Sequence, residues 1–283
     1  MSTTPDLTVS HTSIVTPDQI DELGHMNVRW YGANAHAGTQ KMCEQLGLAS
    51  PTISSTYTRH HHEQMEGNKL EVRSAVLGGK QLRFFHELRN QDDDDLAATF
   101  VHELDNPSIE TPTIELPDYG QPRSIDLHVD RMASAPTMAD LQSRGLAARH
   151  AREVTTEDSL GADIVPPWLT NNLLWGGERL DGETSWIQET EDGDRVAFAS
   201  METRLRIGRP VALGTRIQSF SAAVHLGAKI SHELNWVFEV DSAELLAVAE
   251  TIDLAFSISQ RRSTDMPPAV RAREEARLHP DLA

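Results

Sequence analysis

The pattern of apolar and polar positions changes near residue 50 from a helical period to the period of strands. Between residues 31 and 46, the side chains spaced three or four apart are apolar or small and share one helix face. Asn27 can cap a helix over residues 28–46, and Gly47 ends it. From residue 52 onward, apolar and polar residues alternate in segments separated by turn residues. This pattern predicts strands over residues 52–62, 68–78, 80–91 and 95–104.

The second half of the chain repeats this order of one helix followed by strands. Pro167 suits a first helical turn, and a shorter helix is predicted over residues 168–176, before Gly177. The strands predicted after it cover residues 184–191, 195–207, 215–226, 230–240 and 245–259. The expected fold class is therefore α+β, with a helix wrapped by an antiparallel sheet in each half.

A weak internal repeat supports this division. Residues 77–98 align without a gap to residues 226–247, and six of the 22 pairs are identical. Composition alone would give roughly one or two identities, so we interpret the chain as a duplication. The predicted organisation is a first unit at 8–106, a Pro-rich linker at 107–148, a second unit at 149–268 and a charged tail at 269–283.

Composition narrows the function classes. The 283 residues include 43 acidic and 25 basic side chains, a net charge of −18, which disfavours binding to nucleic acid or to anionic membranes. The single cysteine, Cys43, excludes an intrachain disulfide framework. Residues 1–10 lack a secretory pattern, and no run of apolar residues is long enough for a membrane helix. We expect a cytoplasmic protein that uses no metal or cofactor, binds a small molecule and can form a homo-oligomer.

The densest polar cluster lies just before the first helix. It places Asp21, His25 and Asn27 within seven residues of one another, at a helix N-terminus. Free backbone N–H groups and the helix dipole at that position suit a carbonyl oxygen that develops negative charge. The alternative is that Asp21 and Asn27 only form a turn and a cap. The runs His60–His62 and Asp92–Asp95 are interpreted as a strand end and a solvated turn, because neither has the spacing of a metal site.

Three segments resemble a known family. The first reads Val15-x-Pro17-x-x-x-Asp21-x-x-Gly24-His25-Met26-Asn27-x-x-x-Tyr31, and the second reads Thr58-Arg59-His60-His61-His62-Glu63-x-x-x-Gly67-Asn68-x-Leu70. Both resemble hotdog-fold acyl-CoA thioesterases of the 4-hydroxybenzoyl-CoA thioesterase-like group, and look most like the betainyl-CoA thioesterase branch. Asp158-x-x-Gly161 with Gly227-x-Lys229 resembles the degenerate second half of double-hotdog members. The resemblance covers about residues 12–104 and 150–268, and it implies a tandem hotdog.

The resemblance also implies roles for individual residues. Asp21 matches the acidic residue that acts as nucleophile or as general base on water. His25 and Asn27 match positions that orient the thioester or the water, backbone N–H groups from Met26 to Val28 polarise the carbonyl, and Glu63 matches a second carboxylate. The expected substrate-binding residues near them are Gly24, Met26, Trp30 and Tyr31.

The second half departs from the pattern, since Ala162 follows Gly161 where His25 follows Gly24. We therefore expect one working site, with phosphates of coenzyme A contacting Arg206, Arg209 and Lys229. The leading hypothesis is hydrolysis of a small or medium acyl-CoA to free acid and CoA. Alternatives are a hydratase or dehydratase on the same fold, whose motif places His five residues after Asp rather than four, and a non-catalytic acyl-thioester binding protein.

Overall fold

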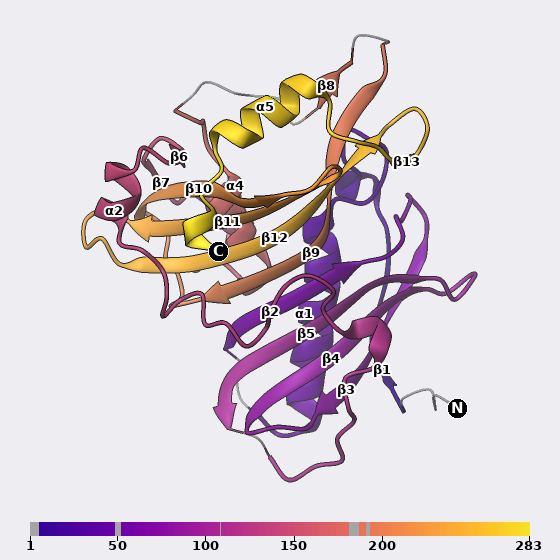
Figure 1. Ribbon diagram of the computed structural model, residues 1–283. Coiled ribbons are helices and arrows are strands. Elements are labelled where there is room, and N and C mark those ends of the chain that lie inside the picture. The colour runs from indigo at the N-terminus through magenta and orange to yellow at the C-terminus, as the bar shows by residue number, and fades with distance from the viewer. Residues whose placement is uncertain (1–5, 49–51, 108, 181–186, 191–192) are drawn as a thin grey trace. The chain divides into compact units, whose positions relative to one another are not determined.

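The computed structural model describes residues 6–48, 52–107, 109–180, 187–190 and 193–283 (Figure 1). Its contacts divide the chain into two compact units. The first unit comprises Met1–Arg123 with Pro167–Leu169, and the second comprises Ser124–Pro166 with Thr170–Ala283. Within each unit the strands pair antiparallel, and the two units are described separately.

The first unit is a five-stranded sheet with one long helix, α1 (Val28–Gln45). Its strands are β1 (Thr8–Ile14), β2 (Ile53–His60), β3 (Lys69–Leu77), β4 (Gln81–Asn90) and β5 (Leu96–Pro107), with short 3-10 turns η1 (Pro17–Gln19) and η2 (Asp118–Gly120). The strand order is β1-β3-β4-β5-β2, and every pair is antiparallel. The predicted helix and the four predicted strands are confirmed, whereas β1 was not predicted.

Helix α1 packs against β1, β3, β4 and β5. The apolar part of this contact includes Tyr31 and Ala35, which lie in one buried cluster with Val72 and Phe100. The helix approaches the sheet closely at Gly38, where an added Cβ would lie 2.8 Å from Val72 Cγ1. The small residue at this position therefore allows the helix to approach the sheet closely.

A buried polar network also joins the helix to the sheet. The Thr39 hydroxyl lies 2.9 Å from His86 Nε2 and 2.7 Å from His102 Nδ1, while Ser74 Oγ lies 2.6 Å from His86 Nδ1. Both rings are almost fully buried. Burial lowers the pKa of His86 to about 3 and that of His102 well below its usual value, so both rings are neutral in the fold.

The second unit has the same kind of sheet with shorter helices. The order β9-β12-β11-β10-β6 is antiparallel throughout, and β13, β7 and β8 pair with β12, β10 and β9. The strands are β6 (Ala147–Ala148), β7 (Arg152–Glu153), β8 (Gln188–Glu189), β9 (Arg195–Ile207), β10 (Arg216–Leu226), β11 (Ile230–Glu239), β12 (Leu245–Ser257) and β13 (Arg262–Ser263). The helices are α2 (Met138–Ser143), α3 (Thr156–Ser159), α4 (Thr170–Trp175) and α5 (Pro268–Ala276), and the 3-10 turns are η3 (Pro167–Leu169), which belongs to the first unit, and η4 (Pro280–Leu282).

The predicted strands over 195–207, 215–226, 230–240 and 245–259 are confirmed as β9 to β12. The predicted helix over 168–176 is confirmed as η3 followed by α4, which packs on β10, β11 and β12. Of the strand predicted over 184–191, only Gln188–Glu189 forms a strand, and residues 184–186 and 191 lie outside the described residues. Within the tail, α5 buries Val270 and Glu274.

Candidate active site

The loop between η1 and α1 is a compact turn that presents Asp21 and His25. A β-bridge joins Ile20 to Met26, and Gly24 allows the reversal because its φ of +86° is one that L side chains rarely adopt. Asp21 Oδ1 accepts a hydrogen bond from the Leu23 N–H at 2.9 Å. The carboxylate is thus oriented by the backbone of its own turn.

The His25 ring lies between two carboxylates. Its Nδ1 is 3.1 Å from Asp21 Oδ2, and its Nε2 is 3.5 Å from Glu63 Oε1. The side chains of His25, Asp21 and Glu63 are 15%, 19% and 41% exposed, so the array is reachable from solvent without being fully hydrated. A neutral imidazole has one N–H, so it can donate to one carboxylate at a time and relay a proton between them. The structure therefore brings together three of the four predicted catalytic side chains.

The fourth, Asn27, is the N-cap of α1, and its Oδ1 accepts a hydrogen bond from the Arg29 N–H at 3.1 Å. Two of the three backbone N–H groups expected to polarise a carbonyl are already used, since Met26 donates to Gln64 O and Asn27 donates to Gln19 O. Within the described residues, no hydrogen bond from the Val28 N–H is seen. Val28 is therefore the backbone donor at this helix start that remains open to a ligand.

The expected substrate-binding residues divide into two groups. Met26 and Tyr31 are buried in the core of the first unit, and the Tyr31 hydroxyl donates to the His62 carbonyl at 3.3 Å. Burial raises the pKa of Tyr31, so the phenol stays neutral. Trp30 packs against Trp168 with ring centroids 5.6 Å apart. Both tryptophan side chains, Trp30 and Trp168, are partly exposed.

The segment that carries Glu63, residues 61–68, connects β2 to β3, and Gln64 within it is buried. The sequence pattern does not indicate this glutamine, and in the fold the residue is only 2% exposed. Its main-chain carbonyl accepts the Met26 N–H at 2.7 Å, which joins the segment to the Asp21 loop. Gln64 is identified by its burial and its hydrogen bonds beside the His25 cluster, and both become visible only in the folded structure.

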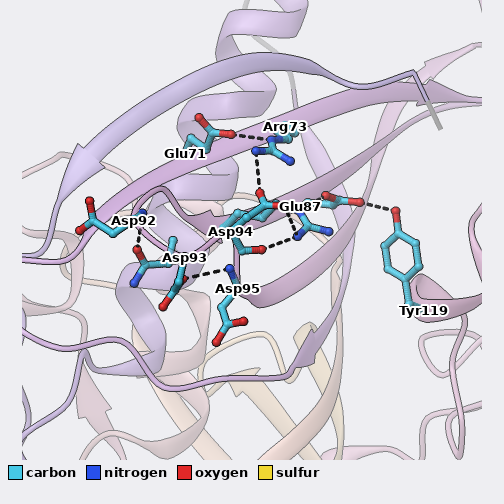
Figure 2. A network of polar contacts seen from close by, with 10 residues as sticks. Glu71, Arg73, Glu87, Asp92, Asp93, Asp94, Asp95 and Tyr119 are labelled. Atoms are coloured by element: carbon cyan, nitrogen blue, oxygen red, sulfur yellow. Dashed lines mark hydrogen bonds and ion pairs between the residues drawn. The ribbon is translucent and has the colours of Figure 1, made fainter. Parts of the chain in front are cut away.

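The run Asp92–Asp95 forms the turn between β4 and β5, as predicted, but it is not simply solvated. Figure 2 shows Asp94 among the side chains of β3 and β4, where its carboxylate pairs with Arg73 Nη2 at 2.8 Å. Arg89 contacts the same carboxylate and also Glu87, whose other oxygen accepts from the Tyr119 hydroxyl. This turn is held by arginines of the neighbouring strands.

The proposed phosphate contacts all lie in the second unit. Arg209 Nη2 and Nε each lie 2.9 Å from a carboxylate, that of Glu239 and that of Glu244 respectively, so its charge is balanced within the chain. Arg206 is half-buried on β9, and Lys229 is exposed in the turn between β10 and β11. Of the three, Lys229 is the most exposed.

Among the described residues of the second unit, no array like that of Asp21, His25 and Glu63 is seen. Asp158, which the expected repeat aligns with Asp21, receives two hydrogen bonds from Arg152 at 2.8 and 2.9 Å and a third from the Thr155 N–H. Burial alone would raise the pKa of Asp158, but these bonds outweigh it and lower the pKa. A carboxylate held in this way is a structural ion pair. In the part of the chain that the structure describes, no group of three or more His, Cys, Asp or Glu is arranged to hold a metal ion, and none of the helices could span a membrane.

Comparison with known proteins relates part of the chain to thioesterases. Residues 15–105, the segment that contains Asp21, His25 and Glu63, match the family model of the thioesterase-like superfamily. A search of the curated proteins finds no match. The match and the hotdog architecture together support a thioester hydrolase.

Solved thioesterases share the fold over most of this chain. The 12:0-ACP thioesterase from Umbellularia californica is similar with a TM-score of 0.60 and 8% identity, over 88% of this chain and 94% of that one. An acyl-ACP thioesterase from Bacteroides thetaiotaomicron VPI-5482 gives a TM-score of 0.59 and 10% identity, over 87% of this chain and 97% of that one. At these identities the likeness establishes the hotdog thioesterase fold alone.

Proposed function

We propose that the chain hydrolyses small or medium acyl-CoA thioesters to the free acid and CoA at the Asp21 site. The observation that carries the proposal is the array of Asp21, His25 and Glu63 beside the N-terminus of α1. A carboxylate, an imidazole and an open helix N-terminus are what thioester hydrolysis requires: a base or nucleophile, a proton carrier and a donor for the oxyanion.

In this mechanism Asp21 removes a proton from water, and the resulting oxygen attacks the thioester carbonyl carbon. The carbonyl oxygen becomes an oxyanion, which accepts the Val28 N–H at the positive end of α1. The C–S bond then breaks and releases the thiolate of CoA. Asp21 transfers its proton to His25 Nδ1, and the imidazolium, which the Glu63 carboxylate stabilises, gives its Nε2 proton to the thiolate.

Two finer points belong to the same proposal. A net charge of −18 disfavours an acidic carrier protein as the substrate carrier, although the two solved relatives are acyl-ACP thioesterases. The carboxylates of Asp21 and Glu63 favour an acyl group that carries a positive charge, in keeping with the resemblance to betainyl-CoA thioesterases. We therefore place betainyl-CoA first among the substrates to be tested.

The test is release of free thiol from betainyl-, acetyl-, short branched, medium-chain and aromatic acyl-CoAs, and from acylated carrier protein. Asp21→Asn is expected to lower kcat by roughly 100-fold or more. Asp18→Asn, three residues away and exposed, is the matched control and should keep wild-type activity. Absence of thiol release from every substrate would overturn the proposal, and enoyl-CoA hydration and thermal-shift binding would then identify the rival function.

A further inference from the structure

Gln64 is the buried residue that joins three parts of the candidate site. Its carbonyl oxygen accepts the Met26 N–H at 2.7 Å, from the loop that carries Asp21 and His25. Its Nε2 donates to the Glu63 carbonyl at 2.9 Å, within the segment that carries the second carboxylate. Its Oε1 accepts from Asn90 Nδ2 at 3.2 Å, at the end of β4.

Asn90 provides a fixed anchor for this arrangement. It is 6% exposed, and its Oδ1 accepts the Asp92 N–H at 2.9 Å, which closes the turn after β4. The chain of hydrogen bonds therefore runs from the end of a sheet strand through Gln64 to both loops. Each polar side-chain atom of these two buried amides has a hydrogen-bond partner, which favours the observed rotamers because another rotamer would break these bonds.

Glu63 itself needs such support. Its side chain is 41% exposed and its contact with His25 Nε2 is 3.5 Å, a distance that depends on where the backbone of Glu63 lies. A shift of about 1 Å would remove a contact of this length, and displacements of that size lower catalytic rates up to about 100-fold.

We infer that Gln64 is a positioning residue, which through Asn90 holds the backbone of Glu63 where its carboxylate meets His25. The inference rests on the proposed function, and it identifies a determinant that neither the sequence pattern nor the family match indicates. Gln64 touches no reacting atom in this scheme and acts only through Glu63.

The kinetic test is a double-mutant cycle on thioester hydrolysis. Gln64→Met keeps the side-chain volume in the buried site and removes both side-chain hydrogen bonds. We expect kcat to fall about tenfold or more with KM within about threefold, and no further fall when Gln64→Met is added to Glu63→Gln. The inference would be overturned if Gln64→Met lowered kcat by the same factor in the wild-type protein and in Glu63→Gln, because a merely structural role does not depend on Glu63.

Two further variants keep the test decisive if Gln64→Met fails to fold. Asn90→Asp retains the oxygen that closes the turn and loses the N–H donor to Gln64, so it should reproduce the loss in kcat. Gln81→Ala is the control, since Gln81 lies at the opposite end of β4 and donates to the Leu104 carbonyl. It should leave kcat unchanged.

An NMR measurement separates this inference from the proposed function. The ring nitrogen signals of His25, assigned by their loss in His25→Gln, report Nδ1 and Nε2 independently of turnover. Gln64→Met and Glu63→Gln should change the Nε2 signal in the same way and leave the Nδ1 signal, which reports Asp21, in place. An unchanged Nε2 signal in Gln64→Met overturns the positioning role, whereas a chain without thioesterase activity overturns only the proposed function.

Discussion

The imidazole of His25 and the carboxylate of Asp21 meet at 3.1 Å within one turn of five residues. The same carboxylate accepts the Leu23 N–H through its other oxygen. The Leu23 N–H and the His25 ring thus contact different oxygens of the carboxylate and fix its orientation. This geometry suits an attack by Asp21 on the thioester carbon as well as the removal of a proton from water, and the proposed mechanism uses the second role.

A single-turnover experiment in oxygen-18 water checks that role. With enzyme in excess over acyl-CoA, the acid released in the first turnover should contain oxygen-18, because water attacks the thioester carbon directly. Hydroxylamine should convert none of Asp21 to a hydroxamate. An unlabelled product in the first turnover, or a hydroxamate at Asp21, would establish the covalent route instead.

The open Val28 N–H can be removed without disturbing the helix. Val28 is the first residue of α1, a position that tolerates proline, and Asn27 before it has φ −60° and ψ 137°, which suit a residue preceding proline. We expect Val28→Pro to lower kcat by roughly 100- to 1,000-fold, with the melting temperature unchanged. Val28→Ala keeps the N–H and should keep kcat. Equal activity in the two variants would exclude this amide as the oxyanion donor.

The buried histidines make the fold sensitive to acid. The pKa of His86 is about 3 in the fold because of burial and is about 6.5 when unfolded, so between these values the unfolded chain binds the additional proton. Stability is therefore complete above about pH 6.5 and falls as the pH is lowered. At pH 5.5 each such ring should cost about 1.4 kcal/mol of unfolding free energy.

Urea unfolding at pH 7.5 and pH 5.5 measures this loss. His86→Gln should lose its own share of the pH dependence. His128→Gln, which changes an exposed histidine, should retain the full dependence. A wild-type protein whose unfolding free energy is equal at both pH values would contradict the buried neutral state of His86.

Two glycines of α1 should respond in opposite directions to alanine. At Gly38 the added Cβ would lie 2.8 Å from Val72 Cγ1 and 2.9 Å from Ser10 Oγ, so we expect Gly38→Ala to lower the unfolding free energy by about 1–3 kcal/mol. At Gly32 the nearest atom is Trp168 Cβ at 3.5 Å, an ordinary contact, and the helix should gain about 0.5–1 kcal/mol. Chemical denaturation of both variants checks the pair, and destabilisation by Gly32→Ala would contradict it.

The period of apolar residues was sufficient to predict α1 and the long strands, because one face of each is buried. It was not sufficient for β1, whose sequence Thr8–Ile14 is mostly polar and whose side chains are largely exposed at the sheet edge, with a bulge at Val9 and His11. Because neither face of β1 is fully buried, its apolar residues show no strand period. A strand of this kind is defined by its hydrogen bonds to β3 rather than by its own sequence.

For the candidate site, the sequence indicated the residues that are neighbours in the chain or match the family. Asp21 and His25 are four positions apart in the sequence, and their contact follows from a local turn. Gln64 and Asn90 are 26 residues apart and meet only when β3 and β4 pair. Their importance depends on burial and on partners from another strand, and a single sequence shows neither.

The bidentate pair of Arg152 with Asp158 has a kinetic consequence for the proposed enzyme. Because Arg152 holds the Asp158 carboxylate in an ion pair, the proposed enzyme uses the Asp21 array alone among the described residues. Titration with a tight, non-hydrolysable acyl-CoA analogue should therefore saturate at one equivalent per chain. The rate of an isolated chain should then rise hyperbolically with substrate concentration. A sigmoidal curve would have to come from association between chains and not from communication between two halves of one chain.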